Sequence, residues 1–280
     1  RPLSSAIGMG IITAGHHNGW VVAEGGTQTI TDAMVKRFVE FGGRIETGVP
    51  VRSIDDLPPA DITMLDLTPE VVAKVLADRL PGRVRRAFTK FRRSPGAFKV
   101  DFAVHGGVDW TNPDAHRAGT LHLGGSAAET IATEREIAAG RMPERPFVLV
   151  GQQYLADPGR SVGDVHPLYP YAHVPHGYDG DATEAIIGQI ERFAPGFRDR
   201  IVGMAVRSTN EMAAYNANYV GGDIVTGAAP TCRPLPPRRP GRRSGGCGPP
   251  CPAGCGPRSP APCPRGRPAT PTGSWPSAAG

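Results

Sequence analysis

The chain has 280 residues and a formal net charge of +5, but its charges are unevenly distributed. Residues 230–280 carry eight arginines, no lysine and no acidic residue, so the body before them is mildly acidic. This argues against a nucleic-acid-binding body that works by neutralising phosphates. No apolar run approaches the roughly 18 residues of a membrane span, and the body is long enough for a substantial hydrophobic core.

Residues 25–67 contain the first predicted unit. Gly25 and Gly26 predict a turn, and Gly42 and Gly43 predict the end of the helix that follows. "RIETGVPVRSI" predicts a strand, a tight turn at Gly48 and a second extended piece, and "DITMLDL" predicts another short strand. The helix between the glycine pairs is predicted by apolar residues at helical spacing, namely Ile30, Ala33, Met34, Phe38 and Phe41.

Two helices are predicted next. Thr68 and Pro69 are typical of a helix start, with the threonine as a capping residue and the proline in the first turn. A second, basic helix is predicted over about 82–92. Its arginines allow contact with an anionic membrane or nucleic acid, while a solvated helix face is the ordinary alternative.

From Gly96 the pattern changes to a period of two. Phe98, Val100 and Phe102 alternate with Lys99 and Asp101, which predicts a half-buried strand with one apolar face. Further strands are predicted over 119–123, 146–150 and 168–174, and further helices from Ser126 to about Gly140 and over 182–193. The pattern predicts an α/β protein.

Residues 230–280 use a different set of residue types. They hold 15 of the 30 prolines, all five cysteines and a single leucine as their only large aliphatic residue. Such a segment has too little apolar surface to offset its ordering entropy, so we expect a disordered Pro/Arg/Gly-rich tail. Residue types with A/T-rich codons disappear after Ala229, which suggests a GC-rich gene read out of frame; a genuine basic tail is the alternative.

Six blocks of the body, in order, resemble the phytoene desaturase and carotenoid isomerase-like branch of the FAD-dependent oxidoreductases. They are "EGGTQTITDAMVKRFVEFGGRIETGVPVRSI", "GAFKVDFAVHGGVDW", "RAGTLHLGGSAAE", "RPFVLVGQQYLADPGR", "YAHVPHG" and "IERFAPGFRDRI" followed by "NANYVGGDI". The resemblance implies a partial FAD/NAD(P)-binding Rossmann-like domain plus a mixed β-sheet substrate domain with crossing helices.

The same resemblance implies a domain organisation. We expect a substrate-domain or cap segment over 1–24 and part of the FAD-binding domain over 25–67. A helical linker and the substrate domain would occupy 68–207, the chain would return to the FAD-binding domain over 208–229, and the tail would follow over 230–280. The family's GxGxxG turn, which holds the FAD pyrophosphate, is not found in this sequence. We therefore expect this chain by itself to be unable to hold FAD.

The activity implied is that of an FAD-dependent oxidoreductase acting on a polyene or isoprenoid-like apolar substrate. Hydride transfer to or from the flavin would desaturate, saturate or isomerise the chain, as in carotenoid biosynthesis. We expect a cytoplasmic protein, with peripheral membrane contact as an option, no nucleic-acid partner and no structural metal. The alternative is a non-enzymatic α/β binding protein whose basic tail contacts nucleic acid or acidic partners.

Few residues can be assigned roles from the sequence, and no catalytic residue can be named. Gly25 and Gly26 could place backbone N–H groups near the cofactor, or could form a simple turn. The resemblance implies that Val51 contacts the FAD adenine through main-chain groups and that His173 makes a polar contact near the substrate. It also assigns a strand to the floor of the substrate pocket, with three apolar residues that could equally pack on a helix: Phe98, Val100 and Phe102.

Overall fold

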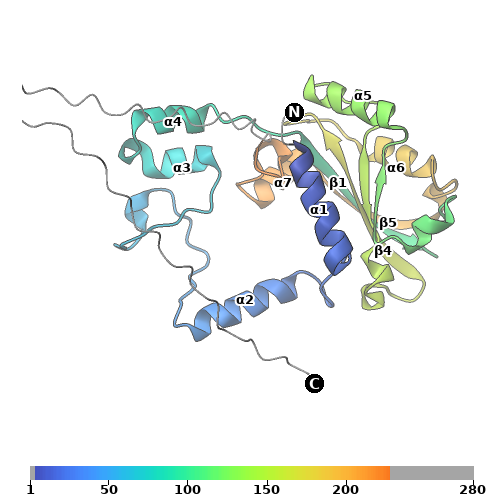
Figure 1. Ribbon diagram of the computed structural model, residues 1–280, viewed down its shortest axis with the longest axis horizontal. Coiled ribbons are helices and arrows are strands. Elements are labelled where there is room, and N and C mark those ends of the chain that lie inside the picture. The colour runs from blue at the N-terminus through green and yellow to red at the C-terminus, as the bar shows by residue number, and fades with distance from the viewer. Residues whose placement is uncertain (1–3, 228–280) are drawn as a thin grey trace, which may run out of the picture. The chain divides into compact units, whose positions relative to one another are not determined.

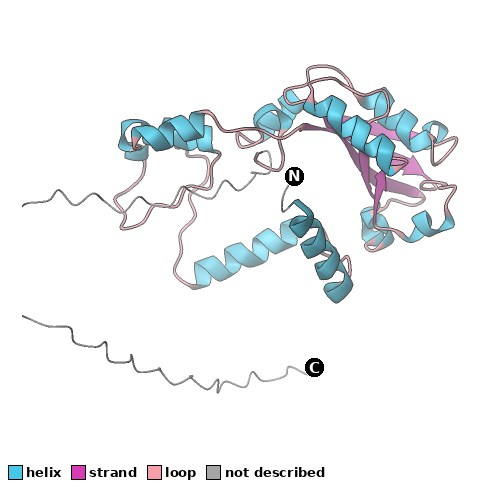
Figure 2. Cartoon of the chain, turned by 45° about the horizontal axis from the view of Figure 1, so that its top comes forward, coloured by secondary structure: helices cyan, strands magenta, loops and turns pink. Residues whose placement is uncertain are grey.

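The computed structural model describes residues 4–227 of the chain (Figures 1 and 2), so the predicted tail lies outside the described residues. The strands are β1 (Gly96–His105), β2 (Thr120–Leu123), β3 (Val148–Gly151), β4 (Val165–Val174) and β5 (Ile201–Arg207). The α-helices are α1 (Ser4–Asn18), α2 (Gln28–Glu40), α3 (Pro69–Leu76), α4 (Gly82–Thr89), α5 (Ala127–Ala138), α6 (Thr183–Glu191) and α7 (Thr209–Tyr215).

The five strands form one sheet in the order β2-β3-β4-β1-β5, drawn in magenta in Figure 2. Ala172 of β4 lies opposite Phe98 of β1 on one side and Val148 of β3 on the other. All four strand pairs are antiparallel, so the expectation of a mixed sheet was wrong. The reason is topological: α5 links β2 to its antiparallel neighbour β3, and α6 links β4 to β5, which are not neighbours in the sheet.

The core lies between one face of this sheet and α6. Phe102 meets Phe197 edge to face, with ring centroids 5.3 Å apart, and Ile186 and Ile190 of α6 are fully buried beside them. Each large apolar side chain buried in this way contributes about 1.5–3 kcal/mol. The alternation read from the sequence of β1 is therefore confirmed as the origin of the core face.

A buried amide completes the core at the sheet edge. The Gln152 side chain, 1% exposed, accepts a hydrogen bond from Trp110 Nε1 at 2.8 Å. Its Nε2 donates to the carbonyl oxygens of Ala115 and Ala118 at 2.9 and 2.7 Å. The amide is fully used, so it fixes the loop before β2 against the end of β3.

The predicted elements of residues 25–67 are only partly present. The glycine turn, α2 and the stop at Gly42, which has φ +83°, are confirmed. The strands predicted over 44–54 and 61–67 are wrong, because neither segment has a neighbouring strand to complete its backbone hydrogen bonds. Several of their apolar side chains stay exposed, including Ile45, Val49, Ile62 and Met64.

Two predicted helix starts differ in detail. Helix α3 begins after Thr68 as expected, but the buried Thr68 hydroxyl caps no N–H group and has no hydrogen-bond partner among the described residues. Ser126 does cap α5, where it accepts a hydrogen bond from Glu129 N at 3.2 Å. The Glu129 carboxylate pairs with Arg192 and does not complete a capping box with the backbone nitrogen of Ser126. This ion pair joins α5 to the end of α6.

Three elements were not predicted from the sequence. Helix α1 contains Gly8, Gly10 and Gly15 and has no clear apolar stripe. Strand β5 is interrupted by a register shift opposite Ala103 and Val104, which blurs its alternation. Helix α7 does carry a readable signal, because its start is a complete capping box in which Ser208 and Glu211 bond each other's backbone N–H.

The segment after α7 packs on the residues that lead into β1. Asp223 is fully buried and accepts hydrogen bonds from the backbone nitrogens of Ser94 and Gly227, at 3.0 and 2.8 Å. The expected division into FAD-binding and substrate parts stays a prediction. Of the helices in the described residues 4–227, none is both long and apolar enough to cross a membrane.

Candidate functional site

The second face of the sheet, opposite the core face, carries the polar residues of the alternating pattern. We call it the cleft face; it presents Lys99 and Asp101 from β1 and Tyr169 and Tyr171 from β4. Lys99 lies opposite Tyr171 in the strand register. These side chains are half-buried or partly exposed, so this face can receive a ligand that the core face cannot.

A cavity of about 430 Å³ lies between the cleft face and the segment that leads into α2. We call it the cleft. Its volume falls in the range of roughly 300–1,000 Å³ that is usual for small-molecule sites. The residues that line it are Val21, Val22, Ala23, Thr27, Ile30, Lys99, Asp101, Gln153, Arg160 and Tyr169.

Three long-range hydrogen bonds hold the segment before α2 in place. Trp20 Nε1 donates to Thr120 Oγ1 at 3.2 Å, and Gly25 N donates to Asp157 Oδ2 at 3.0 Å. Arg160 Nη2 donates to the carbonyl oxygen of Ala23 at 3.2 Å, while its Nε donates to Asp157 at 3.0 Å. The segment is thus tied to the loop between β3 and β4 and to β2.

The polar groups of the cleft form two connected sets. The Lys99 ammonium pairs with the Asp101 carboxylate and lies 5.6 Å from the centre of the Tyr169 ring. The Tyr169 hydroxyl accepts a hydrogen bond from Gln153 Nε2 at 2.9 Å. Burial raises the pKa of the neighbouring Tyr171, and Tyr169 raises it further.

The predicted cofactor residues Gly25 and Gly26 form a turn with φ angles of +74° and +98°. Their N–H groups are already used, because Gly25 N donates to Asp157 and Gly26 N donates to the Ala23 carbonyl at 3.1 Å. The Asp157 carboxylate beside the turn is paired with Arg160, so this ion pair offers no net positive charge to attract a phosphate. The described residues at this turn therefore do not fit the pyrophosphate of FAD.

Val51, predicted to lie beside the FAD adenine, is half-buried in an irregular segment and not in a strand. It does not line the cleft. The backbone nitrogens of Arg52 and Ser53 each donate to Asp56 Oδ2 at 2.8 Å, and these bonds lower the pKa of the Asp56 carboxyl. This local carboxylate therefore shapes the segment that follows Val51.

The predicted pocket residues Phe98, Val100 and Phe102 are 1%, 0% and 2% exposed and belong to the core face. Their position favours the packing interpretation over the pocket interpretation. The cleft residues of the same strand are the alternating neighbours Lys99 and Asp101, which were read from the sequence only as the polar side of β1.

His173 lies on the cleft face, away from the cleft itself. Its Nδ1 is 2.7 Å from Glu134 Oε1 of α5, and its ring lies 5.3 Å from that of Phe147. It lines a separate cavity of about 200 Å³ with Tyr171 and Ser94. In the part of the chain that the structure describes, no group of three or more His, Cys, Asp or Glu side chains could hold a metal ion.

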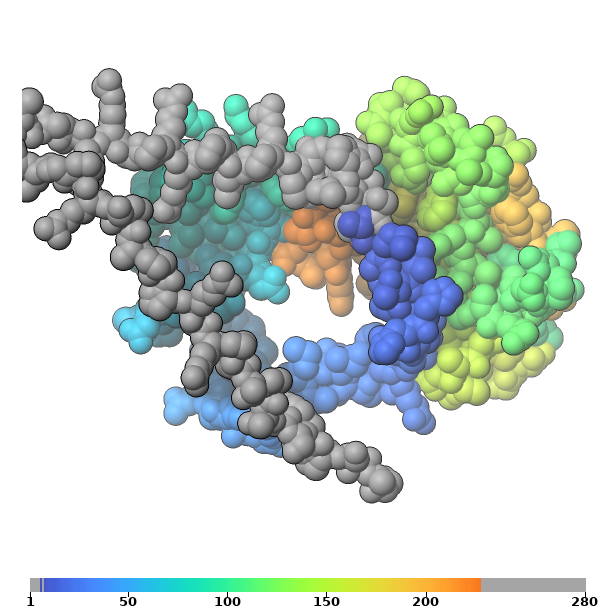
Figure 3. All heavy atoms as spheres, in the orientation of Figure 1, coloured from blue at the N-terminus to red at the C-terminus, as the bar shows by residue number. Residues whose placement is uncertain are grey.

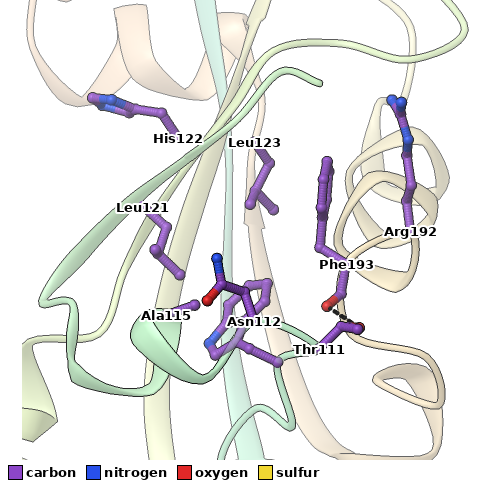
Figure 4. Close-up of a pocket in the computed structure, with 9 residues that line it drawn as sticks. Thr111, Asn112, Ala115, Leu121, His122, Leu123, Arg192 and Phe193 are labelled. Atoms are coloured by element: carbon purple, nitrogen blue, oxygen red, sulfur yellow. Dashed lines mark hydrogen bonds between the residues drawn. The ribbon is translucent and has the colours of Figure 1, made fainter. Parts of the chain in front are cut away.

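A further cavity of about 420 Å³ lies at the β2 edge of the sheet (Figure 4). Leu121 and Leu123 point into it from β2, while His122 points to the other side of the strand. Phe193 closes it from the end of α6, and its carbonyl oxygen accepts a hydrogen bond from Thr111 Oγ1 at 2.9 Å. Its lining is mostly apolar, so it offers fewer groups for chemistry than the cleft.

Sequence reasoning missed Gln153, Arg160 and Tyr169 as cleft residues. Gln153 and Arg160 lie inside the block "RPFVLVGQQYLADPGR", but nothing in the sequence indicates which of its polar residues faces a cavity. Tyr169 alternates with Leu168 and Pro170, so its face could have been found from the period of β4.

Neither a scan against protein-family models nor a search of curated proteins found a match to this chain.

Proposed function

We propose that this chain carries the substrate-binding part of a flavin-dependent oxidoreductase resembling the phytoene desaturases. The substrate class is an isoprenoid-like chain, and the reaction class is its desaturation, saturation or isomerisation. The proposal starts from the sequence resemblance and is supported by what the cleft brings together.

The single observation that carries the proposal is the convergence of separate sequence blocks on one cleft. Thr27 and Ile30 come from the first block that resembles the family, and Lys99 and Asp101 come from the second. Gln153 and Arg160 come from the fourth, "RPFVLVGQQYLADPGR", more than a hundred residues after the first. Blocks whose order in the sequence resembles one family, and which line one cavity in space, are expected of a shared substrate site.

The apolar surface of α2 supports the same proposal. Ile30, Met34, Phe38 and Phe41 are between 50% and 74% exposed, and α2 buries no residue. The atoms of α2 are visible on the surface in Figure 3, in blue. An amphipathic helix with an uncovered apolar face is typical of a surface that packs on further protein.

In this proposal, residues 4–227 bind the substrate and do not bind the FAD pyrophosphate. The turn at Gly25 and Gly26 does not fit the FAD pyrophosphate, because its N–H groups bond Asp157 and Ala23. The proposal therefore assigns the grip on the flavin to protein outside residues 4–227.

The test uses the natural gene product that contains this sequence, purified from its source. We expect one flavin per chain in the visible spectrum and conversion of an isoprenoid substrate that changes its ultraviolet absorbance. A purified protein with no flavin would contradict the proposal. Salt-sensitive nucleic-acid binding in such a flavin-free protein would favour the binding-protein alternative instead.

A further inference from the structure

The cleft contains hydrogen-bond donors whose protons are not fully used. The Tyr169 hydroxyl accepts a hydrogen bond from Gln153, and its own proton has no acceptor among residues 4–227. The Lys99 ammonium has three protons but bonds only the Asp101 carboxylate within the described part of the chain. Both groups line the same cavity, so a ligand there meets surplus donors.

The charges of the cleft balance one another. Lys99 pairs with Asp101, and Arg160 pairs with Asp157, which is only 11% exposed. Each cation therefore has its own carboxylate partner. A carboxylate on the ligand would have to compete with these partners, whereas a neutral oxygen only adds an acceptor to a free donor.

The opposite wall of the cleft is apolar. Val21, Val22 and Ile30 are 80%, 36% and 52% exposed, and all three line the cavity. A hydrocarbon chain can cover these side chains and remove their surface from water. The cleft thus has one wall suited to a hydrocarbon and one suited to an oxygen acceptor.

We infer that the cleft binds an isoprenoid chain bearing a neutral oxygen, as a hydroxyl or carbonyl group, and not a pure hydrocarbon. The oxygen accepts hydrogen bonds from the Tyr169 hydroxyl and the Lys99 ammonium, and the chain lies on Val21, Val22 and Ile30. The isoprenoid character of the ligand rests on the proposed function, whereas the oxygen rests on the donors of this cleft.

The experiment compares three probes that share one fifteen-carbon chain, using the 280-residue chain and isothermal titration calorimetry. Farnesene has no oxygen, farnesol has a neutral hydroxyl, and farnesoic acid has a carboxylate. We expect farnesol to bind about fivefold to tenfold more tightly than farnesene, the effect of one or two net hydrogen bonds. Farnesoic acid should bind no more tightly than farnesol.

Tyr169→Phe removes the hydroxyl and keeps the ring, so it should weaken farnesol binding by about threefold or more and leave farnesene binding unchanged. Tyr215→Phe is the matched control, because Tyr215 is 70% exposed on α7 and does not line the cleft. Circular dichroism of both variants checks that each keeps the fold of the parent chain.

Equal binding of farnesol and farnesene, or a preference that survives Tyr169→Phe, would overturn the inference. Tighter binding of farnesoic acid than of farnesol would also overturn it, in favour of a carboxylate ligand. If none of the three probes bound, the inference that the cleft takes an isoprenoid chain would be wrong. A flavin-containing natural protein without the farnesol preference would sink only this inference. A flavin-free natural protein that keeps the preference would sink only the proposed function.

Discussion

Asp157 accepts a hydrogen bond from the backbone nitrogen of Gly25 at 3.0 Å, across 132 residues of sequence. The same carboxylate oxygen accepts from Arg160 Nε, and Arg160 in turn donates to the carbonyl oxygen of Ala23. Asp157 and Arg160, in the loop between β3 and β4, thereby hold both Gly25 and Ala23 of the glycine turn in place. This link closes the cleft on the side opposite the sheet.

Replacing Asp157 with alanine should loosen the segment 20–30. The change leaves Gly25 N without its acceptor and Arg160 without its carboxylate, and we expect unfolding to become easier by about 1–3 kcal/mol. Hydrogen exchange of residues 20–30 measures the local effect and should become faster. Asp179→Ala, at an exposed position with no described side-chain hydrogen bond, is the control and should change neither quantity.

Replacing Gln152 with leucine should destabilise the whole sheet. The Trp110 indole N–H and the carbonyl oxygens of Ala115 and Ala118 would lose their partner inside the core, at a cost of about 2–4 kcal/mol. Thermal unfolding followed by circular dichroism gives the change in Tm. Gln28→Leu, on the exposed α2, should leave Tm nearly unchanged; an equal loss in both variants would contradict this account.

Replacing Met34 with glutamate should improve solution behaviour without destabilising the fold. Met34 is 69% exposed on the apolar side of α2, so its replacement removes no core contact. The new carboxylate interrupts an exposed apolar surface that favours self-association. Light scattering and size-exclusion chromatography should report less self-association at an unchanged Tm. Lys36→Glu changes the charge on the same helix and should have little effect on self-association; a large drop in Tm for Met34→Glu would mean that α2 is packed.

Acid should weaken the link between α5 and α6. The Arg192 guanidinium holds the pKa of the Glu129 carboxyl below its usual range, so folding favours the ionised carboxylate. This stability is present above the ordinary glutamate pKa of about 4.3 and is lost as pH falls through the lower folded value. Glu129→Gln should flatten the fall of Tm across this acid range, while Glu144→Gln, at an exposed position, should follow the parent chain.

The 280-residue chain should be purified without bound flavin. Its glycine turn at Gly25 and Gly26 has no free N–H pair for a pyrophosphate and lies beside the Asp157 carboxylate. Bound flavin is measured from the visible absorbance of the purified chain, before and after dialysis against FAD. A stoichiometric flavin band in this chain would contradict the prediction. It would mean that residues other than this turn bind the cofactor.

Part of the fold could be predicted because some signals are local. The period of two from Phe98 to Val104 depends only on the alternation of side chains along an extended strand, and β1 is where it was expected. The glycine pair after Glu40 and the Ser126 cap are likewise local, and both helix limits were correct to within a few residues. The segment 44–67 failed for the opposite reason, because a strand needs a partner that the sequence of the segment cannot supply.

The sequence by itself determined which side chains of β1 face the core and which do not, since a one-residue alternation leaves Phe98 and Lys99 on opposite faces. It could not determine what the polar face meets. Only the tertiary structure brings Gln153, Arg160 and Tyr169 to Lys99, because strand order and register place β4 beside β1. A hydrogen bond from Gly25 to the loop between β3 and β4 holds the segment before α2 in place beside them. A local pattern determines to which face of a strand each side chain points. A site made from distant segments depends on how those segments pair, which no single segment determines.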